Sequence, residues 1–223
     1  MCLAWARSSI GKKILMSVSG LMLIGFIIMH LLGNLLIFRG PDALNAYAEK
    51  LRHYGALLWV ARGTLMAAII VHSITSIQLA RENRRARPQT YAQYQPQTTT
   101  LAARTMLVSG LLLLAYLVYH LLHFTFKVTN PGVSHGIDAL GRHDIYTMVV
   151  SSFRDPRIVA VYVIGVGTVC AHLSHGIGSV PQTLGLSNER TIPVMAWAGR
   201  IASAIIFLGY ISIPLSVLVG VVK

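Results

Sequence analysis

Residues 14–38, with the sequence ILMSVSGLMLIGFIIMHLLGNLLIF, decide the fold of this chain. The stretch carries no charged side chain, and a helix that crosses the hydrocarbon core of a bilayer needs about 20 apolar residues. It is too long for the apolar region of a cleavable signal peptide, so we expect it to stay in the mature protein. The stretch therefore predicts a transmembrane helix.

Four further apolar runs follow, and none shows the alternation of apolar and polar residues that is typical of strands. They cover residues 55–80, 105–126, 158–180 and 201–222. Pro181 should stop the third of these helices, and Pro214 should kink the fourth. The connection 39–54 repeats apolar residues at helical spacing and should form an amphipathic surface turn. The sequence thus predicts an all-α membrane protein, in which five transmembrane helices form a bundle and a single domain covers residues 1–223.

The composition agrees with the bilayer as solvent. Only 12% of the residues are charged and 54% are hydrophobic, whereas a soluble domain carries about 25% charged residues. The net charge of +12 would suggest nucleic acid in a soluble protein, but here the basic residues lie mainly between the apolar runs and should set the topology. Two cysteines are too few for a disulfide framework, and without a CxxCH motif the sequence gives no support for covalent c-type haem attachment.

The orientation in the membrane can be predicted from the Lys and Arg residues of the loops, because membrane proteins in general carry more of them on the cytoplasmic side. With the N-terminus inside, the inside holds ten of the 19 basic residues: Arg7, Lys12, Lys13, Arg81, Arg84, Arg85, Arg87, Arg104, Arg190 and Arg200. The dense cluster 81–87 directly after the second run favours this orientation. We therefore expect a cytoplasmic N-terminus and a C-terminus outside.

Histidines carry the functional signal, because ionisable residues are rare inside spanning helices and usually serve a function there. Six of the nine histidines fall in the apolar runs: His30, His72, His120, His123, His172 and His175. At about 1.5 Å rise per residue, His30 and His120 reach a similar depth in the outer half, and His72 and His172 a similar depth in the inner half. Two imidazoles facing each other at one depth suit a six-coordinate haem iron, so two layers predict two haems.

Other uses of these histidines remain open. A single helical histidine could only hydrogen-bond a neighbouring helix. A di-iron centre would need carboxylates beside the histidines, and the apolar runs contain no Asp or Glu. His123 and His175 each follow another histidine by three residues on the same helix face, so spacing alone does not choose the ligand within a pair.

Short motifs at the histidines resemble one known family in their order and helix placement. The motifs are SIGKK at 9–13, HLLGNL at 30–35, His72 followed by ARENRRARP at 80–88, YHLLHF at 119–124 and AHLSHG at 171–176. Together they resemble the cytochrome b membrane-anchor subunit of succinate dehydrogenase and fumarate reductase, in the class with five helices and two haems. The resemblance covers essentially the whole chain. It implies that His30 pairs with His120, and His72 with His172, as axial metal ligands of two haems b.

The resemblance also implies a function and partners. The chain would be a non-catalytic electron-transfer subunit of the cytoplasmic (inner) membrane, acting between an iron–sulfur subunit and membrane quinone in the tricarboxylic acid cycle enzyme. Succinate oxidation would occur on the partner subunits, a flavoprotein and the iron–sulfur protein docked on the cytoplasmic face. The family includes members that use menaquinone, which we expect as the substrate here. We also expect contacts with lipid, no nucleic acid, and an oligomer of the whole complex.

Residues for the quinone follow from its need for a hydrogen-bond donor and a proton-exchanging group near water. An outer site would use Glu49, Arg52 and His53, although an ordinary solvated amphipathic turn is the simpler explanation of these three residues. An inner site would use Ser19, with Ser17 and Lys13. At this place two-subunit anchors of the superfamily carry an arginine close to a serine, and this chain has Ser17-Val18-Ser19. Arg62 is a candidate haem-propionate partner or a helix-end residue that reaches the interface.

Two rival functions fit parts of the pattern. A cytochrome b subunit of a hydrogenase or formate dehydrogenase would also carry helical histidines, and only its copurifying catalytic subunit would distinguish it. A transporter with a histidine proton relay would purify without colour.

Overall fold

The computed structural model describes residues 8–86 and 104–223. Predictions for residues 1–7 and for the polar connection at 87–103 lie outside the described residues. Helices make up the fold, and the described part of the chain contains no strand, only an isolated bridge between Ile137 and His143. The predicted all-α fold class is confirmed.

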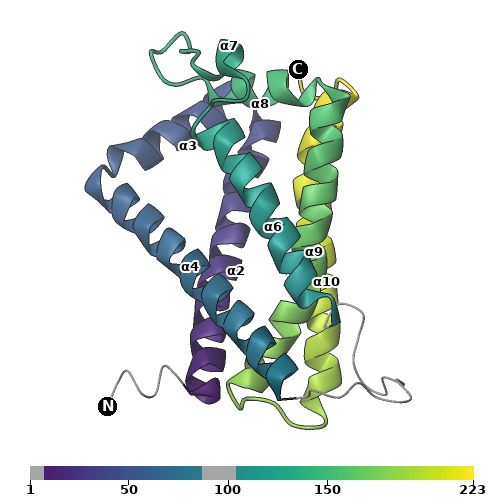
Figure 1. The fold of residues 1–223 in the computed structure, drawn as a ribbon. Helices are drawn as coiled ribbons and strands as arrows, with labels where there is room; N and C mark the ends of the chain where they lie inside the picture. The colour runs from purple at the N-terminus through teal and green to yellow at the C-terminus, as the bar shows by residue number, and fades with distance from the viewer. Residues whose placement is uncertain (1–7, 87–103) are drawn as a thin grey trace. The chain divides into compact units, whose positions relative to one another are not determined.

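Five helices are long and apolar enough to cross a membrane, as the sequence predicts. They are α2 (Ser9–Asn34), continued by the 3-10 turn η1 (Leu35–Arg39); α4 (Ala56–Arg85); α6 (Met106–His120), continued by the π-helical turn η2 (Leu121–Thr125); α9 (Pro156–Thr183); and α10 (Thr191–Leu218) (Figure 1). Many of their large apolar side chains are exposed on the isolated chain. Such surfaces suit contact with lipid.

The end of α9 differs from the sequence prediction, because Pro181 does not stop the helix. The backbone N–H of Leu186 donates to the Pro181 carbonyl at 2.9 Å, and that of Gly185 to the Gln182 carbonyl at 3.2 Å. Gly185 has φ +72°, so this is a Schellman cap with glycine in the left-handed position. The helix therefore ends at Thr183, beyond the predicted end at 180, and Gly185 belongs to its cap.

The start of α10 is also earlier than predicted, at Thr191 rather than at 201. The Asn188 side chain accepts hydrogen bonds from the backbone of Arg190 and Thr191, both at 3.0 Å. The Thr191 hydroxyl in return accepts from the Asn188 backbone N–H at 2.8 Å. These reciprocal bonds cap a helix start, and Pro193 is tolerated because it falls in the first turn, where its missing N–H has no partner to lose.

The connections contain helices of their own. α3 (Pro41–His53) is the amphipathic segment predicted at 39–54, with Leu44 in its buried face. Two short helices that were not predicted from the sequence are α7 (Pro131–Ser134) and α8 (Ile145–Phe153). α8 is too short to span a membrane, yet Met148 and Phe153 are buried in its apolar face.

The chain forms two compact units, each built from parts of the same five long helices. Unit 1 comprises residues 1–25, 63–111 and 171–203, and unit 2 comprises 26–62, 112–170 and 204–223. Unit 2 contains an apolar core to which α3, α8, α9 and α10 contribute side chains. The single domain expected from the sequence stays a prediction.

Glycines bring α9 and α10 into backbone contact within unit 1. A Cβ on Gly199 would lie 2.8 Å from the Ser174 carbonyl oxygen, and one on Gly178 would lie 3.2 Å from the Ala196 Cα. Small residues allow such close approach between membrane helices.

Alanine substitutions at two glycines test this contact, because they should change the stability of the protein in opposite directions. Gly199→Ala should lower the stability of the protein in detergent by about 1–3 kcal/mol, because its methyl group meets backbone that cannot rotate away. Gly63→Ala, on α4 of the same unit, meets no atom within 4 Å and should stabilise the helix by about 0.5–1 kcal/mol. Equal thermal unfolding midpoints of the two variants would contradict the close packing of α9 on α10.

Candidate functional site

Unit 2 brings together His30 on α2 and His120 on α6. Their ring centroids lie 5.9 Å apart, with an interplanar angle of 87°. Phe26 stacks on the His30 ring at 5.3 Å, and Tyr210 of α10 lies 6.3 Å from it. The Tyr210 hydroxyl is fixed by donating to the Ile27 carbonyl at 2.7 Å. Aromatic side chains therefore hold this pair in the unit.

Unit 1 brings together His72 on α4 and His172 on α9. Their ring centroids lie 6.3 Å apart, with an interplanar angle of 68°. Each unit thus contains one pair, and the partners are those that the depth argument and the resemblance give.

The spacing of both pairs fits one metal ion shared by two imidazoles. A metal–imidazole bond is about 2 Å long, and the ring centre lies about 1 Å beyond the bonding nitrogen. Two imidazoles on opposite sides of one metal ion therefore have ring centres about 6 Å apart. A hydrogen-bonded histidine pair without a metal would bring two ring nitrogens within about 3 Å of each other. Among the described residues, no hydrogen bond joins His30 to His120 or His72 to His172, so the residues present fit the ligand role.

The tautomer of neutral His72 follows from its partners. Its Nδ1 lies 3.0 Å from the Met16 carbonyl oxygen, which can only accept. Nδ1 therefore carries the proton, and Nε2 keeps its lone pair. The Ser19 hydroxyl lies 3.5 Å from the same nitrogen and donates to the Leu15 carbonyl at 2.6 Å. A backbone bond to the far nitrogen is the usual way to orient a metal-binding histidine.

The partner of neutral His172 is a hydroxyl, whose direction follows from the hydrogen bond that it donates itself. The Ser109 hydroxyl donates to the Met106 carbonyl at 3.1 Å, so its oxygen is free to accept from His172 Nδ1, also at 3.1 Å. The Nε2 lone pair of His172 is thus the one that remains for a ligand bond.

Two Ser-Gly dipeptides recur at this pair. Ser19-Gly20 of α2 faces His72, and Ser109-Gly110 of α6 faces His172. A Cβ at either glycine would lie 3.3–3.4 Å from the Cε1 of the facing imidazole. Of these four residues only Ser19 was a candidate from sequence, although the repeated dipeptide was a usable signal.

The second histidines of the HxxH pairs differ from each other. His123 lies in η2 and is 1% exposed, and both of its ring nitrogens are engaged, Nδ1 with the Tyr162 hydroxyl at 3.0 Å and Nε2 with the Ser152 hydroxyl at 3.1 Å. Such a ring has no nitrogen left for a metal. His175 is half-buried on α9, and its role stays open.

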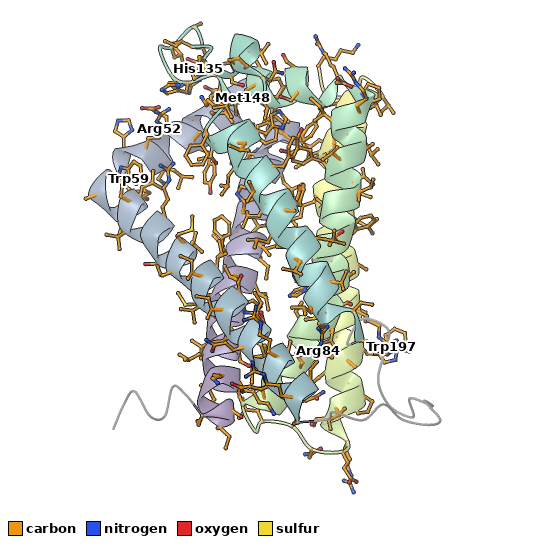
Figure 2. All side chains as sticks on the ribbon, in the orientation of Figure 1. Arg52, Trp59, Arg84, His135, Met148 and Trp197 are labelled. Atoms are coloured by element: carbon orange, nitrogen blue, oxygen red, sulfur yellow. The ribbon has the colours of Figure 1, made fainter. Side chains whose placement is uncertain are left out.

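The outer quinone candidates lie on α3 in unit 2. The Glu49 carboxylate is one-third exposed and lies 3.5 Å from Nδ1 of the exposed His53 ring. Arg52 is exposed on the same helix (Figure 2). Burial and the positive field of Arg52 lower the pKa of Lys127, and burial together with Arg52 and Lys127 lowers the pKa of His143.

His143 and Lys127 were not candidates from sequence. The His143 Nδ1 is buried and has no hydrogen-bond partner in the part of the chain that the structure describes. Lys127 has φ +60°, an unusual backbone conformation for a residue with a side chain. The outer candidates therefore lie beside two further ionisable groups.

Arg62 is exposed, and its guanidinium lies 5.0 Å from the centre of the exposed Trp59 ring (Figure 2). Arginine stacked on tryptophan is a common arrangement at membrane interfaces. This placement favours the interface role over contact with a propionate.

Two further sequence inferences concern unit 1. Ser19 is buried and is engaged with α2 carbonyls and His72, which suits positioning of the histidine better than contact with quinone.

α4 is longer than predicted, so Glu82 lies in a spanning helix, where it pairs with Lys12.

The five helices of spanning length define the class as a multi-pass, all-α membrane protein. None of the family models, curated proteins or solved structures compared with the chain matches it.

Proposed function

We propose that this chain is the di-haem cytochrome b membrane anchor of a succinate:quinone oxidoreductase and passes electrons between an iron–sulfur subunit and membrane quinone. The observation that supports it most is the pair of histidines in each unit, at 5.9 and 6.3 Å between ring centres, on four different apolar helices. The order and placement of the motifs, which resemble the five-helix class of these anchors, supply the identity of the complex.

The residues divide the work between ligation and positioning. His30 and His120 would hold one haem, and His72 and His172 the other. Bound haem b supplies a one-electron carrier within the membrane. Met16, Ser19 and Ser109 keep the histidines of unit 1 in the tautomer with a free Nε2. The small residues Gly20 and Gly110 leave the imidazole rings room to approach the helix backbone.

The quinone chemistry belongs, in this proposal, to the outer candidates on α3. Glu49 would exchange the proton that accompanies quinone reduction or quinol oxidation, and Arg52 would donate a hydrogen bond to a quinone oxygen. The docking of the iron–sulfur subunit and the flavoprotein on the cytoplasmic face, with the N-terminus inside, is part of the same proposal.

The purified complex should contain about two haems b per chain, because four ligands in two pairs hold two six-coordinate irons. A pyridine haemochrome assay against protein concentration measures this ratio, and mass spectrometry of the copurified subunits identifies the complex. We expect a flavoprotein and an iron–sulfur protein.

Other results of this experiment would overturn the proposal in distinguishable ways. One haem per chain would refute the two pairs of ligands. A copurified hydrogenase or formate dehydrogenase subunit would keep the cytochrome and change the complex. A colourless protein would favour the histidine-relay transporter.

A further inference from the structure

A chain of buried polar side chains runs from His120 into the core of unit 2. Its members are His123 of η2, Ser152 of α8 and Tyr162 of α9, which are 1%, 0% and 5% exposed. Burying such groups costs free energy unless each is hydrogen-bonded, and an apolar core of the same shape would avoid that cost. This row of buried polar side chains therefore calls for a functional reason.

The direction of these hydrogen bonds follows from Ser152, the last side chain of the hydrogen-bonded series. The Ser152 hydroxyl donates to the Met148 carbonyl at 2.7 Å, so its oxygen accepts from His123 Nε2–H at 3.1 Å. A neutral imidazole with a proton on Nε2 has a lone pair on Nδ1. His123 Nδ1 therefore accepts the Tyr162 hydroxyl proton at 3.0 Å.

The last bond of the chain reaches the candidate ligand. Since the Tyr162 proton points to His123, the Tyr162 oxygen is free to accept, and it lies 3.4 Å from His120 Nδ1. The proton of His120 is then on Nδ1, and its Nε2 keeps the lone pair that a metal bond needs. One backbone carbonyl, that of Met148, thus fixes the protons of four side chains in turn, those of Ser152, His123, Tyr162 and His120.

The π-helical turn η2 makes this arrangement possible. It begins directly after His120, and the Phe126 N–H donates to the Leu121 carbonyl five residues earlier, at 2.7 Å. His120 and His123 both contact the Tyr162 hydroxyl, from its two sides. Single π turns inside membrane and soluble helices are frequent at functional sites.

We propose that Tyr162, His123 and Ser152 are positioning residues that hold His120 in the Nδ1–H tautomer and increase electron donation from its ring to a bound metal. The inference rests on the proposed function, since it concerns the haem that His30 and His120 would hold. Donation of the Tyr162 proton to His123 makes the phenol oxygen a stronger acceptor, because hydrogen bonds in a chain polarise one another. A more basic imidazole stabilises the oxidised metal and lowers its midpoint potential.

Redox titration of the purified complex tests the phenol. Tyr162→Phe should raise the midpoint potential of one of the two haem transitions and leave the other unchanged, with haem content retained. Tyr119→Phe is the matched control, because Tyr119 lies in the same aromatic cluster, 5.9 Å from the Tyr162 ring, and its hydroxyl makes no hydrogen bond to the other described residues. Equal potentials in the two variants would overturn the inference.

A second pair of variants at His123 keeps the test sharp if Tyr162→Phe fails to fold. His123→Leu removes the acceptor and should raise the same potential. His123→Gln offers an amide oxygen to Tyr162 and an amide N–H to Ser152, so its potential should stay closer to that of the parent. If His123→Leu and His123→Gln both kept the midpoint potential of the parent, the positioning role would be refuted. A parent protein that contains no haem would refute the proposed function itself.

Discussion

Alanine at His72 or His172 is expected to abolish one haem redox transition, and alanine at His30 or His120 the other. Each substitution removes one axial ligand from a pair, and a six-coordinate iron that loses one of two protein ligands is bound weakly or not at all. Redox titration with optical detection resolves the two transitions in each variant. This effect should be the largest of any single substitution in the spanning helices, because it removes about half of the haem.

The assignment of partners depends on which variants lose the same transition. His30 and His120 belong to unit 2, and His72 and His172 to unit 1, so losses should fall into these two groups. Loss of the same transition in the His30 and His72 variants would refute the pairing.

His123→Ala and His175→Ala test which histidine of each HxxH pair is the ligand, because each lies three residues after a proposed ligand. Both variants should retain two haems. For His123 the structure gives the reason, since Tyr162 and Ser152 already engage its two nitrogens. Bleaching of either haem band in these variants would move the ligand assignment by one turn.

Sequence patterns predict the five spanning helices because each run is long, apolar and free of competing strand periodicity. Helix ends are less predictable, since they depend on local caps. The Schellman cap at Gly185 carries α9 past Pro181, and the Asn188 cap starts α10 before the apolar run begins. Hydropathy alone does not detect either device.

The short helix α8 escaped prediction for a related reason. Its apolar run is far below spanning length, yet it is preceded by Asp144, whose side chain accepts from the Thr147 backbone N–H. A cap residue before a short apolar run is a helix signal. Its importance is tertiary, because α8 supplies Ser152, which contacts His123.

Candidate ligands were predictable from depth, whereas their supporting groups were not. His30, His72, His120 and His172 stand out as ionisable residues in apolar helices. Serines and tyrosines occur widely in membrane helices, so nothing in the sequence distinguishes Tyr162 from other tyrosines, and Ser109 stands out only through the repeated Ser-Gly dipeptide. Only the fold brings them within hydrogen-bond distance of a histidine.

Glu49 and Asp42 lie on the same helix, α3, and offer a matched comparison for the quinone chemistry. Both are carboxylates in unit 2, and Asp42 is largely exposed and paired with Arg142 at 2.9 Å. Glu49 is one-third exposed and belongs to the group of ionisable side chains that includes Arg52 and His143. An amide of the same shape removes proton exchange at either position with little change in packing.

Glu49→Gln is therefore expected to lower quinone-coupled turnover by about 10²–10⁴-fold, the usual contribution of a proton-exchanging group. Haem content and succinate oxidation with an artificial dye should remain intact, because the dye is expected to take electrons before they reach the haems. Asp42→Asn should leave quinone-coupled turnover, haem content and succinate oxidation with the dye at parent values. Both assays are run on the whole complex in detergent with a soluble quinone analogue. Normal quinone activity in Glu49→Gln would return this residue to an ordinary solvated helix and move the search to Arg52, His53 and the inner site around Ser19.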